Sequence, residues 1–436
     1  MPVRHGVRGY TISMSTTVTF LHTADLHLGA PFTGLRTSSG KWARRMVEAI
    51  PEAYGRVIDA ALEHNVDFVV IAGDIFDLAR PSFSDYACFL DGIERLKQAG
   101  IPVYCCTGNH DPSTNWQNRY GKLPDNVFVF PAGEDAGYFV YERDGAPLVL
   151  LGGRGYYNQT WPQGVDIAAG ITRTAGEEAL QTQPPFAVGV LHTGLDIDPV
   201  KAPTSPGALL NTGMDYWALG HIHTPKLYGE GNPRIAFSGC IQGRKIRDAG
   251  PRGVNIVTLS KGEPNQVEFV PTASVVWETP NIDISDCETL ADIATLAKDE
   301  LFRLNGQAAC DEMIERITLS GMTPLHEVLQ QPGVLDDLRQ RINDSYEYFY
   351  CDAIVDETVA VFDRNKALAE GLFPAVFLRV AAQNAADRPR EIAYLQQEFI
   401  DRGLGISNVT DSEMTAMERR AEEIVLDALG RGGDAR

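Results

Sequence analysis

The stretch DYWALGHIHTP, residues 215–225, joins an apolar run to a pair of histidines. Residues 216–219 are typical of a short buried β-strand, which ends at Gly220. His221 and His223 follow with one residue between them, and side chains two residues apart on an extended segment point the same way. Two adjacent imidazoles suit a metal ion, and they also suit two core histidines bonded to backbone carbonyls. Both interpretations fit this stretch alone, so the rest of the chain has to decide between them.

The composition sets broad limits on the class of protein. A length of 436 residues predicts two or three domains, and 44% hydrophobic with 22% charged residues is typical of a soluble globular protein. No apolar run is long enough for a transmembrane helix. The N-terminus has early basic residues but lacks the apolar core of a secretory signal. We therefore expect residues 1–16 to be a flexible extension, with Met14 as an alternative start.

The seven cysteines are an odd number and form no C-x-x-C pair. This pattern favours a reducing cytoplasm and argues against both a disulfide framework and a zinc–cysteine site. Cys105 and Cys106 lie in an apolar run, where cysteine behaves as a small hydrophobic residue. The sequence therefore predicts a cytoplasmic protein without thiolate metal ligands.

Apolar strand-like runs alternate with helical stretches over residues 17–275. The runs are TVTFLHTA, DFVVIAG, IPVYCC, PLVLLGG, FAVGVLHTG and RIAFSG. Between two of them, residues 82–100 carry apolar side chains at helical spacing, with serine near the start and Gly100 at the end, where helix caps belong. This alternation predicts an α/β domain.

The pattern changes after residue 275. Predicted helices and strands then mix over residues 276–365, which indicates a small α+β domain, and residues 366–436 are mostly helical with a disordered tail. In the last predicted helix, charged residues cover one face and an apolar stripe covers the other. The stripe consists of Met414, Met417, Ala421, Ile424, Val425 and Ala428.

Five strand-like runs are followed by residues that bind metals in other proteins. They are Asp25 and His27 in D-x-H, Asp74 and Asp77 in GDIFD, Asn109, His110 and Asp111 in GNHD, His192 after FAVGVL, and His221 and His223 in GHIH. In an α/β domain, functional groups collect in the loops at strand ends. One such coincidence is weak, but five in one domain predict a single site.

The residue types at these strand ends favour particular metals. Carboxylate, imidazole and amide oxygen ligands without thiolates fit Mn²⁺, Fe²⁺ or Zn²⁺ and disfavour a structural zinc site. Two dications about 3.5–4 Å apart require a bridging carboxylate, generate a hydroxide at neutral pH and clamp a phosphate from both sides. Asp74 is the candidate bridge, and the amide oxygen of Asn109 adds a ligand without adding charge.

The five motifs, in this order, resemble those of the calcineurin-like metallophosphoesterases. The longer strings LHTADLHLG, VVIAGDIFDLARPS, CTGNHDP and DYWALGHIH are similar to one branch, the DNA double-strand-break repair exonucleases with their SbcD-type nuclease subunit. The resemblance covers residues 18–270 well and the last third only in outline. It implies a sandwich of two β-sheets flanked by helices, and two divalent ions, most often Mn²⁺.

The resemblance also assigns residues to roles. One ion would be bound by Asp25, His27, Asp74 and His223, and the second by Asp74, Asn109, His192 and His221. His110 would lie beside the phosphate without binding metal, placed to protonate the leaving oxygen or to stabilise charge. This assignment sends His221 and His223 to different ions.

Five further residues receive weaker assignments. Asp77 either orients a ligand histidine or is an ordinary loop carboxylate. Asp111 either orients His110 or caps the following turn, and the turn is the preferred interpretation. Arg80, Arg244 and Lys245 are candidate phosphate contacts, although for Arg80 a structural ion pair is the stronger alternative.

The net charge of −20 argues against a DNA-binding protein and needs an explanation. Residues 1–280 hold 23 Lys and Arg against 28 Asp and Glu, whereas residues 281–436 hold 15 against 30. The acidity thus belongs to the last third, and the basic segments at 34–45 and 243–253 either face phosphates or are solvated loops. We expect the acidic third to face away from DNA.

Partners follow from the resemblance as well. It implies a coiled-coil ATPase of the SbcC type and a homodimer. The helix at 414–428 either docks that ATPase or packs onto its own domain.

These observations predict a two-metal DNA phosphodiesterase, an exonuclease with some single-strand endonuclease capacity that acts in double-strand-break repair or DNA end processing. One rival is a metallophosphoesterase for a small nucleotide or phosphoprotein, which would use the same ligands. Another is a non-catalytic scaffold for the ATPase. The complete ligand set argues against the scaffold, and the domain after residue 275 favours DNA.

Overall fold

The computed structural model describes most of the chain. The described residues are 16–30, 39–77, 81–115, 122–307, 310, 312–344, 347–361, 368–369, 373–386, 388–402 and 410–433. The predicted extension with Met14, the position of Arg80 and the final residues 434–436 lie outside them. The chain divides into two compact units, one of Met1–Glu278 with Asn305–Ile314 and one of Thr279–Leu304 with Glu315–Arg436.

Two six-stranded sheets form the first unit. One sheet has the order β12-β11-β1-β2-β3-β4 and the other the order β5-β6-β7-β8-β10-β9. The first sheet consists of β1 (Thr17–Thr23), β2 (Phe68–Ala72), β3 (Val103–Cys106), β4 (Val127–Val129), β11 (Gly253–Ser260) and β12 (Gln266–Pro271). The second consists of β5 (Gly137–Arg143), β6 (Ala146–Arg154), β7 (Phe186–His192), β8 (Tyr216–Gly220), β9 (Lys226–Tyr228) and β10 (Ile235–Phe237). The short strand β13 (Val275–Glu278) also belongs to this unit.

Alternating side chains build the core between the two sheets. In β1, Phe20 points into a cluster shared with the second sheet, while its neighbour Leu21 points to the opposite face. In β2, Val70 and Ile71 divide in the same way. The strand period of two therefore places one apolar layer between the sheets and another on the outside.

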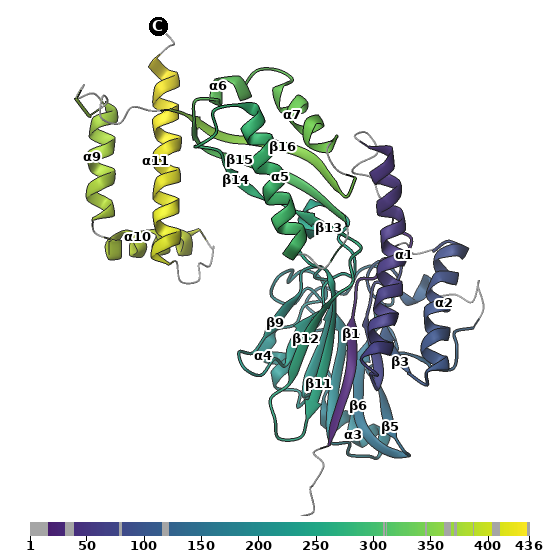
Figure 1. The fold of residues 1–436 in the computed structure, drawn as a ribbon. Coiled ribbons are helices and arrows are strands. Elements are labelled where there is room, and N and C mark those ends of the chain that lie inside the picture. Colours follow the sequence, from purple (N-terminus) through teal and green to yellow (C-terminus); the bar gives the residue numbers. More distant parts are fainter. Residues whose placement is uncertain are drawn as a thin grey trace, which may run out of the picture. The chain divides into compact units, whose positions relative to one another are not determined.

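Helices cover the two outer faces of this sandwich. On the first sheet, α1 (Gly40–Glu63) and α2 (Phe83–Gln98) lie side by side, and on the second lie α3 (Arg173–Leu180) and the short α4 (Pro206–Leu210) (Figure 1). The start of α2 is a capping box in which Ser82 and Asp85 bond to each other's backbone N–H groups. Two sheets flanked by helices confirm the fold expected from the resemblance.

Parallel pairing places the candidate site at the carboxyl ends of the central strands of both sheets. Strands β1, β2 and β3 pair in parallel, as do β6, β7 and β8. Their carboxyl ends therefore lie together, and the polar motifs of the sequence follow directly from those ends. Near the carboxyl end of β1, Nδ1 of the fully buried His22 lies 3.0 Å from the hydroxyl of Tyr216 in the other sheet. His22 is thus a core residue that links the sheets.

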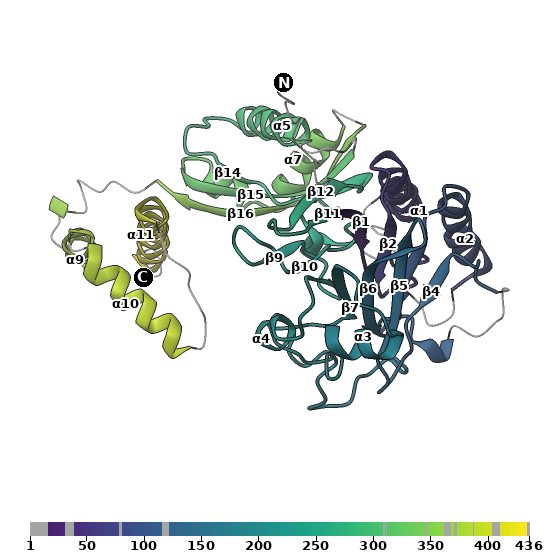
Figure 2. The ribbon, with the colours of Figure 1, turned by 90° about the horizontal axis from the view of Figure 1, so that it is seen from below.

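The second unit begins as an α+β layer. Strand β14 (Asn281–Asp283) pairs in parallel with β15 (Glu312–Thr323), which also pairs with β16 (Phe349–Ala360). Helices α5 (Leu290–Gln307) and α7 (Val334–Asn343) pack on this layer, and the short α6 (His326–Leu329) precedes α7 (Figure 2). The sequence Pro332-Gly333 separates α6 from α7, because proline and glycine both disfavour a continuous helix.

Three helices end the second unit: α9 (Phe373–Ala385), α10 (Arg388–Asp401) and α11 (Asp411–Gly433). Leu378 of α9 and Leu426 of α11 are buried against each other. The predicted stripe of α11 is divided, because Met414 is buried while Met417 and Ile424 remain about half exposed. The helix continues through Gly433, so residues 430–433 extend α11.

Among the described residues, no helix has both the length and the apolar character needed to span a membrane.

Candidate metal centre

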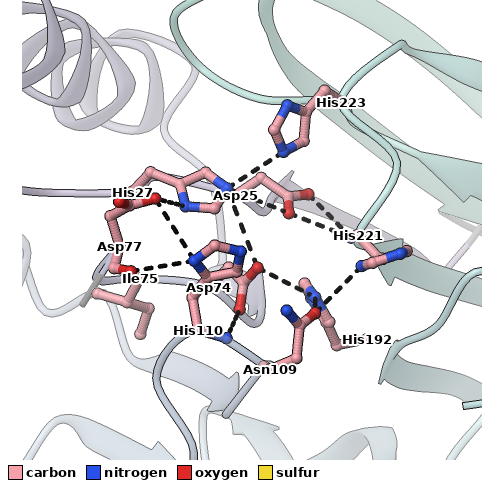
Figure 3. Close-up of polar contacts among 12 residues, drawn as sticks. Asp25, His27, Asp74, Ile75, Asp77, Asn109, His110, His192, His221 and His223 are labelled. Atoms are coloured by element: carbon pink, nitrogen blue, oxygen red, sulfur yellow. Dashed lines mark hydrogen bonds and ion pairs between the residues drawn. The ribbon is translucent and has the colours of Figure 1, made fainter. Parts of the chain in front are cut away.

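Seven predicted ligands converge at the joined strand ends of the first unit (Figure 3). Asp25 and His27 follow β1, Asp74 follows β2, Asn109 follows β3, His192 ends β7, and His221 and His223 follow β8. The structure therefore brings together residues that are up to 198 positions apart in the sequence. Asp25, His27, Asp74 and His192 are almost completely buried.

One subset of donors surrounds Nε2 of His27. This atom lies 3.2 Å from Nε2 of His223, 3.8 Å from Oδ1 of Asp25 and 4.0 Å from Oδ2 of Asp74. Ligand atoms about 2.0–2.2 Å from one ion lie at such mutual distances. The four side chains can therefore hold one divalent ion.

A second subset surrounds the amide oxygen of Asn109. Its Oδ1 lies 3.1 Å from Nε2 of His192 and 3.2 Å from Nδ1 of His221. Oδ2 of Asp74 lies 3.3 Å from Nε2 of His192, so the same carboxylate oxygen borders both subsets. This is the position expected of a carboxylate that bridges two ions.

In His192 and His27, the ring nitrogen that faces away from the centre lies beside an oxygen atom. Nδ1 of His192 lies 2.9 Å from the carbonyl oxygen of Ala72, and Nδ1 of His27 lies 2.9 Å from Oδ1 of Asp77. When Nδ1 donates its proton to such an oxygen, Nε2 carries the lone pair and faces the other donors. The contact with His27 agrees with the first of the two interpretations of Asp77.

Two carboxylates that were not predicted from the sequence contact the corresponding ring nitrogens of His223 and His221. Oδ1 of Asp248 lies 3.2 Å from Nδ1 of His223, and Oδ2 of Asp198 lies 3.3 Å from Nε2 of His221. All four imidazoles thus point one nitrogen at the centre and place the other against an oxygen. Metal-binding histidines in proteins share this arrangement, so the donor set fits a dinuclear divalent centre.

The charges of the centre depend on one another. Burial opposes ionisation, yet His192 lowers the pKa of Asp74, and Asp74 raises the pKa of His192 to about 9. Burial lowers the pKa of His27 to about 4, so this ring is neutral at neutral pH and its Nε2 lone pair is available. Without metal, Asp74 and His192 therefore form an ion pair, and a bound divalent ion would supply the positive charge in place of the imidazolium.

The backbone at the centre is strained. Four predicted ligands have positive φ angles, 51° at Asp25, 48° at His27, 51° at Asp74 and 100° at His221. Non-glycine residues rarely adopt such angles, and they concentrate at functional sites. Gly220 precedes His221 because a Cβ there would lie 2.0 Å from the carbonyl oxygen of Ala72.

His110 lies beside the centre but faces outward. Its backbone N–H donates to Oδ1 of Asp74 at 2.9 Å, and its Nδ1 lies 3.0 Å from the carbonyl oxygen of Asp77. The side chain is 42% exposed, more than the side chains of the four histidines in the donor set. Nε2 of His110 is therefore the nitrogen available to an incoming substrate.

Asp111 braces two of the loops. Its Oδ1 accepts from the Gly108 N–H at 2.8 Å, and its Oδ2 accepts from the N–H groups of Ile75 and Phe76 at 2.9 and 3.4 Å. The carboxylate therefore ties the loop after β2 to the loop after β3. The carboxylate thus joins two loops, whereas the interpretation preferred from the sequence was a cap of one local turn.

The predicted phosphate contacts have different surroundings. Arg80 lies outside the described residues. Nη1 of Arg244 lies 2.6 Å from Oδ1 of Asp77, so its guanidinium pairs with a carboxylate of the centre. Lys245 is exposed at the start of the short turn Ile246–Asp248. Of the two that the structure describes, Arg244 joins the network around the ligands through Asp77.

Residues 18–225 match the family model described as calcineurin-like phosphoesterase. The chain contains a calcineurin-like metallophosphoesterase domain. Members of this family are hydrolases that use two divalent metal ions, in agreement with the donor set at the strand ends. Residues 277–359 match a second model, described as the middle domain of metallophosphoesterase YhaO.

Curated relatives extend the likeness beyond this domain. The chain is 29% identical over 339 residues to a Bacillus subtilis protein named "Uncharacterized metallophosphoesterase YhaO", covering 76% of this chain and 78% of the relative. It is 25% identical over 276 residues to "DNA double-strand break repair protein Mre11" of Aeropyrum pernix, covering 61% and 64%. For the protein of the same name from Methanopyrus kandleri, the identity is 23% over 413 residues, covering 89% and 83%.

Proposed function

We propose that this chain is a Mn²⁺-dependent DNA phosphodiesterase, an exonuclease with single-strand endonuclease capacity that acts in double-strand-break repair or DNA end processing. The observation that carries the proposal is the pair of donor subsets that share Asp74 beside the exposed ring of His110. The relatives named as double-strand break repair proteins support DNA as the substrate.

In this proposal, Asp25, His27, Asp74 and His223 bind one ion, and Asp74, Asn109, His192 and His221 bind the other. Oxygen and imidazole donors without a thiolate suit Mn²⁺, and also accept Fe²⁺ or Zn²⁺. Held by these residues, such a pair of ions would supply an activated water for attack on phosphorus and positive charge beside the phosphate. The chain itself fixes the orientation of the ligand side chains, because each of the four histidines has an oxygen partner at its other ring nitrogen.

His110 is the proposed catalytic residue. Its Nδ1 is directed at the carbonyl oxygen of Asp77, and Oδ1 of Asp77 lies 3.5 Å away. With both oxygens on the Nδ1 side of the ring, Nε2 is the nitrogen left to face the substrate. Such a group donates a proton to the leaving sugar oxygen, a contribution of about 10²–10⁴-fold for general acids.

One experiment tests the activity and its substrate. The purified chain is incubated with Mn²⁺ and, in parallel, a labelled DNA duplex, a labelled single strand and bis(p-nitrophenyl) phosphate. We expect cleavage of both DNA substrates, with products released progressively from the duplex ends. Cleavage of the small diester alone would contradict a DNA substrate, and no cleavage of any substrate would contradict the enzyme.

We further propose a capping domain over residues 276–365, most of which belongs to the second unit, and a partner-binding region over residues 366–436. The partner is a coiled-coil ATPase of the SbcC type, and the chain forms a homodimer. Half-exposed Met417 and Ile424 on α11 support a docking surface on this helix.

Co-purification with the ATPase tests this partnership. Deleting residues 405–436, or replacing Ile424 by Asp, is expected to abolish co-purification, whereas Ser412→Asp on the same helix keeps it. Unchanged binding of the deletion variant would contradict the docking helix. Light scattering of the full chain tests the dimer.

A further inference from the structure

Arg244 lies in the loop between β10 and the turn Ile246–Asp248, outside the donor set. Its side chain is 18% exposed, and Nη1 lies 2.6 Å from Oδ1 of Asp77, whose side chain is 11% exposed. A guanidinium paired this closely with a shielded carboxylate fixes where that carboxylate points. Asp77 is in turn the group that holds His27.

The side chain of Arg244 therefore acts on His27 through one intermediate. Oδ1 of Asp77, the atom that Arg244 contacts, lies 2.9 Å from Nδ1 of His27. Without the guanidinium, the carboxylate can rotate away, and the imidazole loses the acceptor that fixes its tautomer.

The backbone of Arg244 acts on a second histidine. Its N–H donates to Oδ2 of Asp248 at 3.0 Å, and Oδ1 of Asp248 lies 3.2 Å from Nδ1 of His223. Asp248 is only 3% exposed, so few waters compete for its oxygens. One residue thus reaches two imidazoles by separate chains of contacts.

The two imidazoles belong to the same half of the centre. Nε2 of His27 and Nε2 of His223 lie 3.2 Å apart. In the other half, His192 is held by the carbonyl of Ala72 and His221 by Asp198. Neither of those two contacts passes through Arg244, so its influence is confined to the half with His27 and His223.

We propose that Arg244 is a positioning residue for one of the two metal sites, the site of His27 and His223. This inference rests on the proposed two-metal centre. It differs from a phosphate contact, because it acts through Asp77 and Asp248 on the metal ligands. Loss of the side chain should weaken one ion selectively and leave the other in place.

The test measures metal binding directly, with equilibrium dialysis against Mn²⁺ and electron paramagnetic resonance of the bound ions. Wild-type protein is expected to bind two Mn²⁺ with the spectrum of a coupled pair. Arg244→Met should bind one Mn²⁺ normally, with the affinity for the second reduced about 10–100-fold and a spectrum of isolated Mn²⁺. Arg244→Lys, which keeps the charge, should restore part of the loss.

Two further variants separate positioning from general damage. Arg173→Met removes an arginine of similar exposure that pairs with Glu177 and Asp215 elsewhere in this unit, and it should leave both affinities unchanged. Asp248→Asn, which alters the contact with His223, should weaken the same ion as Arg244→Met.

Normal binding of both ions by Arg244→Met, or equal weakening of both, would overturn the inference. DNA cleavage by the wild-type protein is measured on the same samples and tests the proposed function separately. A wild-type chain that binds two ions without cutting DNA would refute that function only.

Discussion

The two units of the molecule differ in the kind of side chain that they bury and the kind that they expose. The first unit buries polar side chains, and Asp25, Asp74 and His192 are at most 2% exposed at its strand ends. The second unit exposes apolar side chains on its last helices, including Phe373 at 66% and Tyr394 at 64%. Buried charges require an ion or a polar partner, and exposed apolar groups favour a covering surface. The contrast agrees with the two proposals made above, metal ions for the first unit and a protein partner for the second.

The largest expected effect is at the shared carboxylate of the first unit. Asp74→Asn removes the charge that borders both donor subsets, so at least one ion should be lost and DNA cleavage should fall more than about 10⁴-fold, or about 5.5 kcal/mol. Metal content and cleavage rate are measured together. Asp67→Asn at the other end of β2 is the control, and a variant at position 74 with both ions and normal rate would disprove the bridge.

The second effect separates chemistry from metal binding within the same unit. His110→Gln should keep both ions, because His110 is not among the proposed ligands, while turnover falls about a thousand-fold, within the range for a lost general acid. The same two assays apply. His64→Gln, at the end of α1, serves as the control, and near-normal cleavage by His110→Gln would show that another group protonates the leaving oxygen.

A third, smaller effect concerns the pH dependence of stability. Burial lowers the pKa of His22 from about 6.5 to about 4, so the unfolded chain binds a proton more readily than the folded one. The stabilisation from neutral His22 is complete above pH about 6.5 and is lost as the pH falls to about 4, by about 3 kcal/mol. Metal-free protein should show this loss in unfolding titrations of the first unit.

The His22→Gln variant is the control for this third prediction. It should lower the slope of stability against pH over this interval, and His27, which has a similar shift, should account for part of the remainder. An unchanged slope in the variant would mean that His22 stays neutral or charged in both states.

The smallest expected effect is in the second unit. Ile424→Ser alters a side chain that is 52% exposed, so the free energy of unfolding should change by less than about 0.5 kcal/mol. Metal binding and DNA cleavage should stay within about twofold, since the ligands lie in the other unit. A large loss of cleavage would show that this helix affects the centre and would break the contrast between the units.

The sequence predicted the strands and the donors after them because both depend on short local patterns. His192 ends a buried run, and Gly220 with His221 and His223 follows another, so the α/β pattern alone directs these residues to one edge. The left-handed angles at Asp25 and His27 could not be predicted, since no local rule requires them in non-glycine residues.

The oxygen partners of the histidines were beyond the sequence for a different reason. Asp198 and Asp248 lie in loops, and their contacts depend on how each loop returns to the sheet. The usable signal was weak: each is a carboxylate within 25 residues of the histidine it contacts. The contact of Arg244 with Asp77 was not predicted, because the sequence reveals a charge but not the distance to the nearest carboxylate.

The placement of the donors across two sheets has a mechanical consequence. In the proposed assignment each ion takes ligands from the loops of both sheets: His27 and His223 for one, Asn109 and His192 for the other. Two ions would therefore hold the two sheets together along the seam at the carboxyl ends of their parallel strands. At the other end the sheets are joined by protein groups alone, including the ion pair of Arg143 in β5 with Asp67 before β2. Metal affinity and the opening of this seam would then be two measures of the same equilibrium. Chelation should accelerate amide exchange at the carboxyl ends of β1, β2 and β7 before any other part of the first unit.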